Sequence, residues 1–178
     1  MVSPFLACAG ETIALLARTT GDTQYLKIAV DLAKRVLASA SVFPFFHLSA
    51  RVALALVAVQ QEDAKEAASQ YRALLPHAGT ASPASCTLLD RVLGLLAETM
   101  GELDRAAEHF EAALAFARKG GYRPELAWTC CDYADLLRER NAPGDGERAA
   151  ALLDEALALA QQMGMRPLAE RVQARRGT

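Results

Sequence analysis

The cysteines are the first side chains to consider for chemistry, because a thiolate can act as a nucleophile, bind a metal ion or form a disulfide. The chain has 4 of them, Cys8, Cys86, Cys130 and Cys131, and no two are spaced as in a CxxC pair. Cys130 and Cys131 are neighbours, and neighbouring side chains on a helix point about 100° apart, which does not suit a shared metal ion. We therefore expect no metal site, no disulfide framework and a reducing, cytoplasmic location.

The histidines and glycines do not point to catalysis either. His47, His77 and His109 stand singly, without a cysteine or carboxylate at ligand spacing on the same helical face. The sequence has no Gly-x-Ser-x-Gly motif to expose a serine nucleophile, and none of its 11 glycines forms a phosphate-binding loop. It therefore predicts a protein that is not an enzyme and that holds no cofactor.

The elements that carry these residues are predicted to be helices throughout. Ala (37) and Leu (26) far outnumber the β-branched Val (9) and Ile (2), and this balance favours α-helix over strand. No apolar run approaches the length of about 18 residues that a membrane span requires. The formal net charge of −2 gives no general preference for nucleic acid or for an acidic membrane.

The strongest pattern in the chain is an internal repeat of about 40 residues. Apolar residues at 103, 106, 107, 110, 113, 114 and 117 form one helical stripe. The triplet 106/110/113 matches the triplets 26/30/33, 67/71/74 and 149/153/156, with shifts of 41, 39 and 43 residues between successive copies. Each such helix follows another Ala-rich helix, so we expect four antiparallel hairpins in a single domain, 1–178.

Turn residues place the borders of these hairpins. The four leading helices are expected at Phe5–Thr20, His47–Gln61, Ser85–Met100 and Pro124–Arg140. Prolines suit the first turn of a helix, and Gly21 and Gly101 suit helix ends. The hairpins then cover approximately residues 4–40, 44–79, 83–120 and 123–164, with about eight helices, and residues 165–178 form a C-terminal cap or tail.

Five residues of the third repeat, Gly94, Gly101, Ala106, Phe110 and Ala113, resemble the framework of the tetratricopeptide repeat. In that family small residues stand where paired helices cross, with an aromatic residue between them. The framework positions of the neighbouring repeats are Ala67, Tyr71, Ala149, Leu153 and Ala156. The resemblance implies a right-handed α-solenoid, and it covers nearly the whole chain.

The repeats depart from the family pattern, since they lack its early Trp and are longer than its usual length of about 34 residues. In this they are similar to the divergent repeats in the C-terminal helical region of bacterial MalT-like and LuxR-type regulators and cyclase-linked signal-transduction ATPases. That resemblance implies a non-catalytic interaction scaffold or sensor module in signal transduction or transcription regulation. Nothing in the chain resembles a domain that reads nucleic acid.

The concave face is the surface on which we expect a partner, because the leading helices of such solenoids line it. The family's groove positions predict an apolar floor, a polar rim and an aromatic anchor. The floor is Val52, Leu56, Val59, Leu88 and Leu95, the rim is Arg18, Arg91, Asp135 and Arg138, and the anchor is Trp128. An exposed apolar patch typically marks an interface. The alternative is that tight superhelical curvature buries these apolar residues, and Trp128, in the core.

Three roles remain open for such a module. It binds a protein or peptide segment in its groove, with the flanking domains of a larger regulator as one form of partner; or it senses a small molecule or peptide effector; or it self-associates. The end residues for self-association are Phe5, Leu6, Met163, Met165 and Leu168. The arginines near the C-terminus either favour a helix end or begin a linker toward a neighbouring domain; they are Arg166, Arg171, Arg175 and Arg176.

Overall fold

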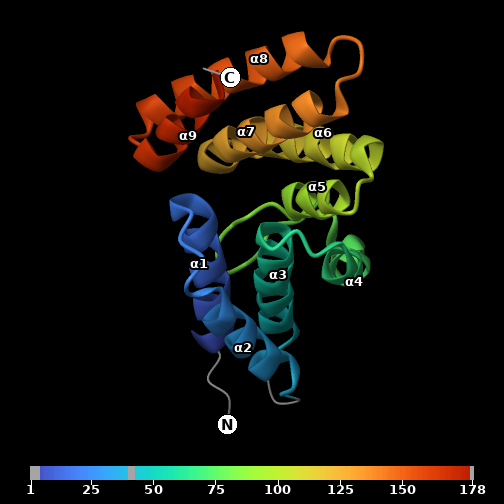
Figure 1. Cartoon of the computed structure of the whole chain (residues 1–178). Coiled ribbons are helices and arrows are strands. Elements are labelled where there is room, and N and C mark those ends of the chain that lie inside the picture. Colours follow the sequence, from blue (N-terminus) through green and yellow to red (C-terminus); the bar gives the residue numbers. More distant parts are fainter. Residues whose placement is uncertain (1–4, 40–42, 177–178) are drawn as a thin grey trace.

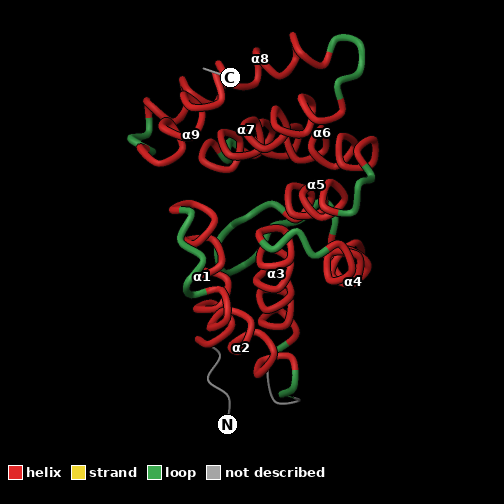
Figure 2. The backbone as a smooth tube through the Cα atoms, in the orientation of Figure 1, coloured by secondary structure: helices red, strands yellow, loops and turns green. Residues whose placement is uncertain are grey.

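The computed structural model describes residues 5–39 and 43–176, and over these ranges the chain is built from helices and contains no strand (Figures 1 and 2). The helices are α1 (Phe5–Thr20), α2 (Leu26–Leu37), α3 (Pro44–Gln60), α4 (Ala64–Leu74), α5 (Leu89–Thr99), α6 (Leu103–Gly120), α7 (Arg123–Arg140), α8 (Asp145–Gln162) and α9 (Arg166–Arg176). A short 3₁₀ turn, η1 (Leu75–His77), follows α4. The prediction of an all-helical protein is confirmed.

The predicted helix borders hold best where the turn residues are clearest. The first helix has the expected bounds, Phe5–Thr20. Helix α3 begins at Pro44 rather than His47, because proline fits the first helical turn, where its missing N–H is not needed. Helix α5 begins at Leu89 rather than Ser85, because the residues before it form an extended connection in which Ala81 pairs with Leu88 in an isolated antiparallel bridge.

The expected C-terminal tail is a ninth helix over most of its length. Helix α9 covers Arg166–Arg176 and packs against α8. Leu168 and Val172, one turn apart, are both fully buried there. The expectation of about eight helices is corrected in this way, because buried apolar side chains and the ion pairs of Arg171, Arg175 and Arg176 hold the segment as a helix against its neighbours.

Most helices pack on their neighbours in the chain, and α3 also packs on α1 and on α5. Figure 1 shows the resulting stack, with α1, α2 and α3 at one end and α8 and α9 at the other. The stack curves so strongly that α1, the first helix, contacts α9, the last. This curvature brings residues from both ends of the chain to one place.

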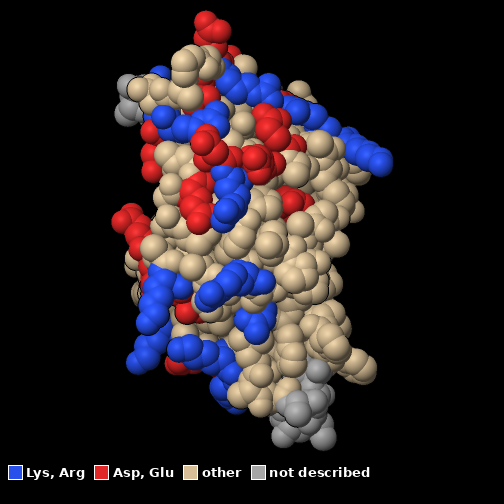
Figure 3. All heavy atoms as spheres, turned by 90° about the vertical axis from the view of Figure 1, so that its right-hand side faces the viewer, with Lys and Arg blue, Asp and Glu red and all other residues tan. Residues whose placement is uncertain are grey.

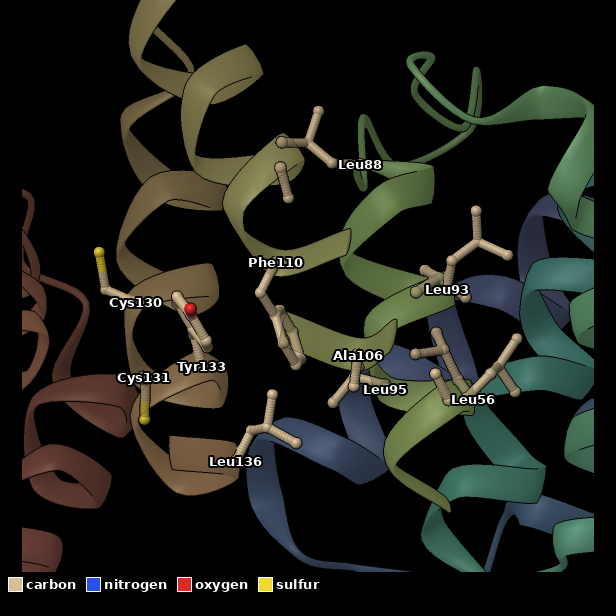
Figure 4. Packing of buried hydrophobic residues seen from close by; sticks show 14 of the residues in the cluster. Leu56, Leu88, Leu93, Leu95, Ala106, Phe110, Cys130, Cys131, Tyr133 and Leu136 are labelled. Carbon is tan, nitrogen blue, oxygen red and sulfur yellow. The ribbon is translucent and has the colours of Figure 1, made fainter. Parts of the chain in front are cut away.

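The core contains the framework residues that the repeat pattern singled out. Gly94 lies against the Phe110 ring, so that a Cβ at position 94 would stand 3.1 Å from three ring carbons. Phe110 is completely buried and stacks on Tyr133 with 5.5 Å between ring centroids (Figure 4). Gly101 ends α5 in the left-handed region with φ 76°. The remaining framework residues are all buried: Ala67, Tyr71, Ala106, Ala113, Ala149, Leu153 and Ala156.

A helix that spans a lipid bilayer is long and largely apolar. In the part of the chain that the structure describes, no helix combines the length and the apolar character needed to cross a membrane.

Candidate functional site

The expected apolar floor of the groove is corrected by the structure. Val52, Leu56, Leu88 and Leu95 are at most 3% exposed, and Val59 is half-buried against the same cluster. Helix α3 is covered by α1, α4 and α5 at once, so its apolar residues face other helices instead of solvent. Val52, Leu56 and Leu88 belong to the core, which is the alternative that tight curvature allows, whereas Val59 and Leu95 also line a pocket.

A charged pocket lies instead on the side of the molecule where α1, α7 and α9 meet. Its volume is about 580 Å³, and its walls come from α1, α3, α5, α7 and α9, together with the turn after α3. The lining residues are Arg18, Val59, Glu62, Leu95, Glu98, Thr99, Asp132, Asp135, Glu139 and Arg171. Figure 1 shows α1, α7 and α9 converging on this side of the molecule. The pocket therefore joins the first helix to the last.

Asp132 lies at the centre of the ion pairs behind this pocket. Its side chain is completely buried, and its Oδ1 accepts from Arg18 Nη2 at 2.8 Å while its Oδ2 accepts from Arg91 Nε at 2.9 Å. A third guanidinium, that of Arg171, stands 3.5 Å from Oδ1. Arg91 also donates through Nη1 to Glu125 at 3.0 Å. One carboxylate of α7 thus ties together α1, α5 and α9.

The charges of this cluster keep one another ionised. Burial by itself would raise the pKa of Asp132, but Arg18, Arg91 and Arg171 outweigh it and hold that pKa well below the ordinary value. Burial would likewise lower the pKa of Arg91, and the carboxylates of Glu125 and Asp132 outweigh it and raise that pKa. Both groups are therefore charged in the folded protein over the whole physiological pH range.

Trp128, the expected anchor, is half-buried between two of these arginines. The guanidinium carbon of Arg91 lies 5.5 Å from the ring centroid, and that of Arg171 lies 5.8 Å from it. Arg91 is only 2% exposed, so its expected place in the polar rim is corrected. It is buried because Glu125 and Asp132 on the adjacent helix supply its counter-charges.

Two of the other expected rim residues, Asp135 and Arg138, lie on α7 and meet α9. The Asp135 carboxylate accepts from Arg175 Nε and stands 3.5 Å from Arg171 Nη2. Arg138 Nη1 donates to the Arg175 carbonyl oxygen at 2.6 Å. The structure therefore brings Arg18, Asp135 and Arg138 to the same side of the molecule, together with an α9 that the groove prediction did not include.

Glu98 is the carboxyl of the pocket with the most perturbed ionisation. Burial, together with the nearby carboxylates of Asp132, Glu139 and Asp135, raises the pKa of Glu98 to about 8, although Arg18 opposes the shift. At neutral pH this side chain is mostly protonated and can donate a hydrogen bond to a bound group. The pocket consequently gains negative charge as the pH rises through about 8.

We expect the Glu98→Gln variant to be more stable than the wild type at pH 9 and nearly equal to it at about pH 4. A carboxyl whose pKa is raised by folding supports the folded state below its unfolded-state pKa of about 4.3. That support is lost as the pH rises toward the folded value of about 8. Urea unfolding across this range measures the change, whose slope is at most about 1.4 kcal/mol per pH unit. The Glu108→Gln variant, at an exposed position of α6, is the control and is expected to change neither value.

A second carboxyl, Glu11, is completely buried and anchors the connection before α5. It accepts a hydrogen bond from Ser82 Oγ at 2.8 Å and another from Ser85 Oγ. Burial raises the pKa of Glu11, and the two serine hydroxyls partly offset the shift. A smaller pocket of about 200 Å³ begins at Ser85 and adjoins the main pocket at Arg18, which lines both.

His109 lies in a chain of polar contacts between three helices. Its Nε2 is hydrogen-bonded to the Tyr71 hydroxyl at 2.7 Å, and its Nδ1 lies 3.4 Å from Asp90 Oδ1. The other oxygen of Asp90 accepts from the Gly79 N–H at 2.6 Å. This chain of contacts connects α4, α5 and α6. Across residues 5–39 and 43–176 no group of three His, Cys, Asp or Glu side chains is placed to hold a metal ion.

The cysteines are expected to differ sharply in reactivity. Burial raises the pKa of Cys130 and of Cys131 to about 12, so neither forms a thiolate at neutral pH, whereas the Cys86 side chain is exposed. In iodoacetamide labelling at pH 7.5 followed by peptide mass mapping, Cys86 should be modified while Cys130 and Cys131 stay protected until urea unfolds the protein. Modification of all three at one rate would contradict this packing.

The outer face carries ion pairs of a different kind. Arg118 pairs with Glu155 at 2.7 Å, and Arg148 pairs with Glu111 at 3.2 Å, with side chains that are 36–49% exposed. Figure 3 shows acidic and basic side chains interleaved over the upper part of this face. Exposed pairs of this sort contribute little to stability, about 0–1 kcal/mol each.

The end residues expected for self-association are only partly exposed to solvent. Leu168 is completely buried, so it is corrected to a core residue, because it fixes α9 on α8. Leu6, Met163 and Met165 are half-buried. The side chain of Phe5 lies outside what the structure describes.

Sequence reasoning missed Asp132 and Glu125 at the centre of the site, and it named Arg171 only as part of the basic C-terminal segment, without placing it in the groove. The sequence did contain a signal that Asp132 is buried. It follows two cysteines, Cys130 and Cys131, in the middle of helix α7. Its partners could not be found in the same way, since Arg18 is 114 residues away in the sequence.

Comparison of the chain with protein-family models, with curated proteins and with solved structures finds no match. What the protein does is therefore inferred from the pocket, its charges and the helices that meet there.

Proposed function

We propose that this chain is a non-catalytic binding module, and that a segment of a partner protein binds at the charged pocket on its concave side. In this proposal the helices form a right-handed solenoid of tetratricopeptide-like hairpins, with α9 added at the end. The module belongs to a cytoplasmic bacterial regulator of signal transduction or transcription, and the partner is another protein or a flanking domain of the same regulator.

The observation that carries the proposal is the pocket itself. It has a volume of about 580 Å³ and is lined by residues from five helices. Its centre is fixed by the buried ion pairs of Asp132, so its shape is set before a partner arrives. A preformed site loses less conformational entropy on binding than one that must be ordered. Its five carboxyls and two guanidiniums provide charged groups that can give specificity.

Site-specific crosslinking tests this proposal. A photoreactive benzoylphenylalanine is placed at Thr99, which lines the pocket, and in a matched protein at Ala112, an exposed position of α6. After irradiation in an extract of the source cells, mass spectrometry should identify a partner bound from position 99 and not from position 112. The same adduct should be lost when Glu139 in the pocket wall is replaced by Lys. Adducts from position 112 alone would contradict the proposal.

A small-molecule effector is the second candidate for the same pocket. The observation that favours it is that Arg18 of α1 and Arg171 of α9 reach one carboxylate, so a ligand there would couple the two ends of the chain. A ligand that binds one curvature of the stack better than another shifts the equilibrium between them. A change in the radius of gyration by X-ray scattering, on adding a compound that also raises the melting temperature, would favour this role.

A further inference from the structure

Helix α9 already places a basic segment of this chain against the carboxylates of α7. Arg171 Nη2 stands 3.5 Å from Asp132 and 3.5 Å from Asp135, and Arg175 Nε donates to Asp135. Arg171 also lies over the Trp128 ring at 5.8 Å. With four arginines and one glutamate in its sequence, α9 is a strongly basic helix.

The receiving residues lie on one face of α7. Trp128, Asp132, Asp135 and Glu139 are spaced by four, three and four residues, which on a helix places them in a single row. Arg171 and Arg175 are four residues apart, so they also share one face of α9. An acidic and aromatic row therefore faces a pair of arginines one turn apart.

Arg171 is held less tightly than the other two arginines of the cluster. Its two carboxylate contacts are both 3.5 Å, at the outer limit for a hydrogen bond, against 2.8 Å for Arg18 and 2.9 Å for Arg91. Its buried Nε has no hydrogen-bond partner among the residues that the structure describes. An arginine with better geometry could replace it.

The pocket beside Arg171 has room and charge for another arginine. Glu62 and Glu139 line it, and over the described ranges the side chains of these two residues have no hydrogen bond or ion pair. Glu98 also lines it and, mostly protonated at neutral pH, adds a polar group rather than a charge. Val59 and Leu95 give an apolar wall on which the methylene groups of a long cationic side chain can lie. The volume of about 580 Å³ accommodates such a side chain.

We propose that the α7 row of Trp128, Asp132, Asp135 and Glu139 binds an arginine-bearing helix of the partner, and that α9 occupies this row in the free protein as a built-in competitor. The inference rests on the proposed function, since it names the chemistry of the partner segment at the same pocket. The partner carries two arginines one helical turn apart, as α9 does. Its binding displaces Arg171 and Arg175 while Leu168 and Val172 keep α9 attached to α8.

The competition follows from the two sets of contacts that hold α9. Leu168 and Val172 pack on α8 outside the pocket and persist in either state, so only the arginine contacts must be exchanged. A tethered competitor lowers the apparent affinity for a partner in proportion to the fraction of time it occupies the site. Removing the contacts that the arginines of α9 make with the α7 carboxylates should therefore strengthen the binding of an external helix that carries arginines.

Fluorescence anisotropy with the full chain tests the inference. The probe is a labelled peptide with the sequence of residues 164–176, and a second peptide has citrulline at the positions of Arg171 and Arg175. The Arg171→Gln/Arg175→Gln protein should bind the first peptide about tenfold more tightly than the wild type does, and the citrulline peptide should lose this gain. Binding should weaken as salt is raised from 50 to 300 mM, because exposed charges are screened. At about 0.1 M ionic strength, which lies between these two values, the Debye length is about 10 Å.

The Arg118→Gln/Arg148→Gln protein is the matched control, because it removes two arginines from exposed ion pairs of the outer face. It should bind the peptide as the wild type does. Circular dichroism shows whether each variant keeps its helices, and the single Arg175→Gln variant, altered at a partly exposed side chain, is used if the double variant does not fold.

Equal affinities for the wild type and the variant, equal binding of the citrulline peptide, or no binding to either protein would overturn the inference. Those results, combined with a partner crosslinked from position 99, would leave the proposed function standing without α9 as its competitor. Crosslinking from position 112 alone would remove the proposed function itself.

Discussion

We expect the Asp132→Asn variant to lose about 3–5 kcal/mol of its free energy of unfolding, because removing one partner of a buried ion pair leaves the others without counter-charge. Asp132 is completely buried, and it faces Arg18, Arg91 and Arg171 at 2.8, 2.9 and 3.5 Å. Asparagine keeps the size of the side chain and removes its charge, so the loss reports electrostatics rather than packing. Urea denaturation followed by circular dichroism measures it.

The control for this prediction is Asp104→Asn on α6. Asp104 also pairs with an arginine, Arg140, at 3.2 Å, but its side chain is 93% exposed. An exposed pair contributes at most about 1 kcal/mol, so the same chemical change should have little effect there. Equal losses at the two positions would contradict the central role of Asp132.

The difference between wild type and Asp132→Asn should also depend on pH in one direction. Because folding lowers the pKa of Asp132, its stabilising effect is complete above the unfolded-state value of about 3.9 and is lost as the pH falls below it. The two proteins should therefore converge in stability in acid. A difference that stays constant down to pH of about 2 would show that asparagine disturbs packing instead.

The second large effect is expected at Phe110, for which Phe110→Ala should lower the free energy of unfolding by about 3–5 kcal/mol. The ring is completely buried, stacks on Tyr133 at 5.5 Å and lies against Gly94. Figure 4 shows it between Tyr133 and the leucines of α5, so its removal opens a cavity between α5, α6 and α7. Chemical denaturation monitored by tyrosine and tryptophan fluorescence measures the loss.

Two further variants separate the cavity from a general effect of losing an aromatic ring. Phe45→Ala removes a ring that is 43% exposed, and it should change stability by less than about 1.5 kcal/mol. Gly94→Ala adds a methyl group 3.1 Å from the Phe110 ring and should destabilise the wild type. In the Phe110→Ala protein the same methyl group should be tolerated, because the ring is gone. A Gly94→Ala effect of equal size in both backgrounds would contradict the direct contact.

The helices and the faces that they bury follow from local features of the sequence. The ratio of Ala and Leu to β-branched residues fixes helix as the element, and the spacing of residues such as Ala106, Phe110 and Ala113 fixes which side is buried. Those features are local, because they depend on residues within a few turns of one another. For the same reason the first helix was predicted with its observed bounds, Phe5–Thr20.

The surface that is left for binding depends on how the helices pack on one another. Val52 and Leu56 could have faced either a groove or a neighbouring helix, since periodicity gives a buried face but not the curvature of the stack. Curvature depends on small rotations between successive hairpins, which accumulate over the chain. Here the packing of the helices covers the apolar residues and brings α1 to α9.

The charged pocket was hidden from sequence reasoning for the same physical reason. Arg18 and Asp132 are separated by 114 residues, and Arg171 lies another 39 residues beyond Asp132, so no local pattern relates the three charges. A buried charge is stable only with its partners in place, and those partners arrive when the ends of the stack close on each other. The sequence thus determined the helices, while their packing determined the pocket.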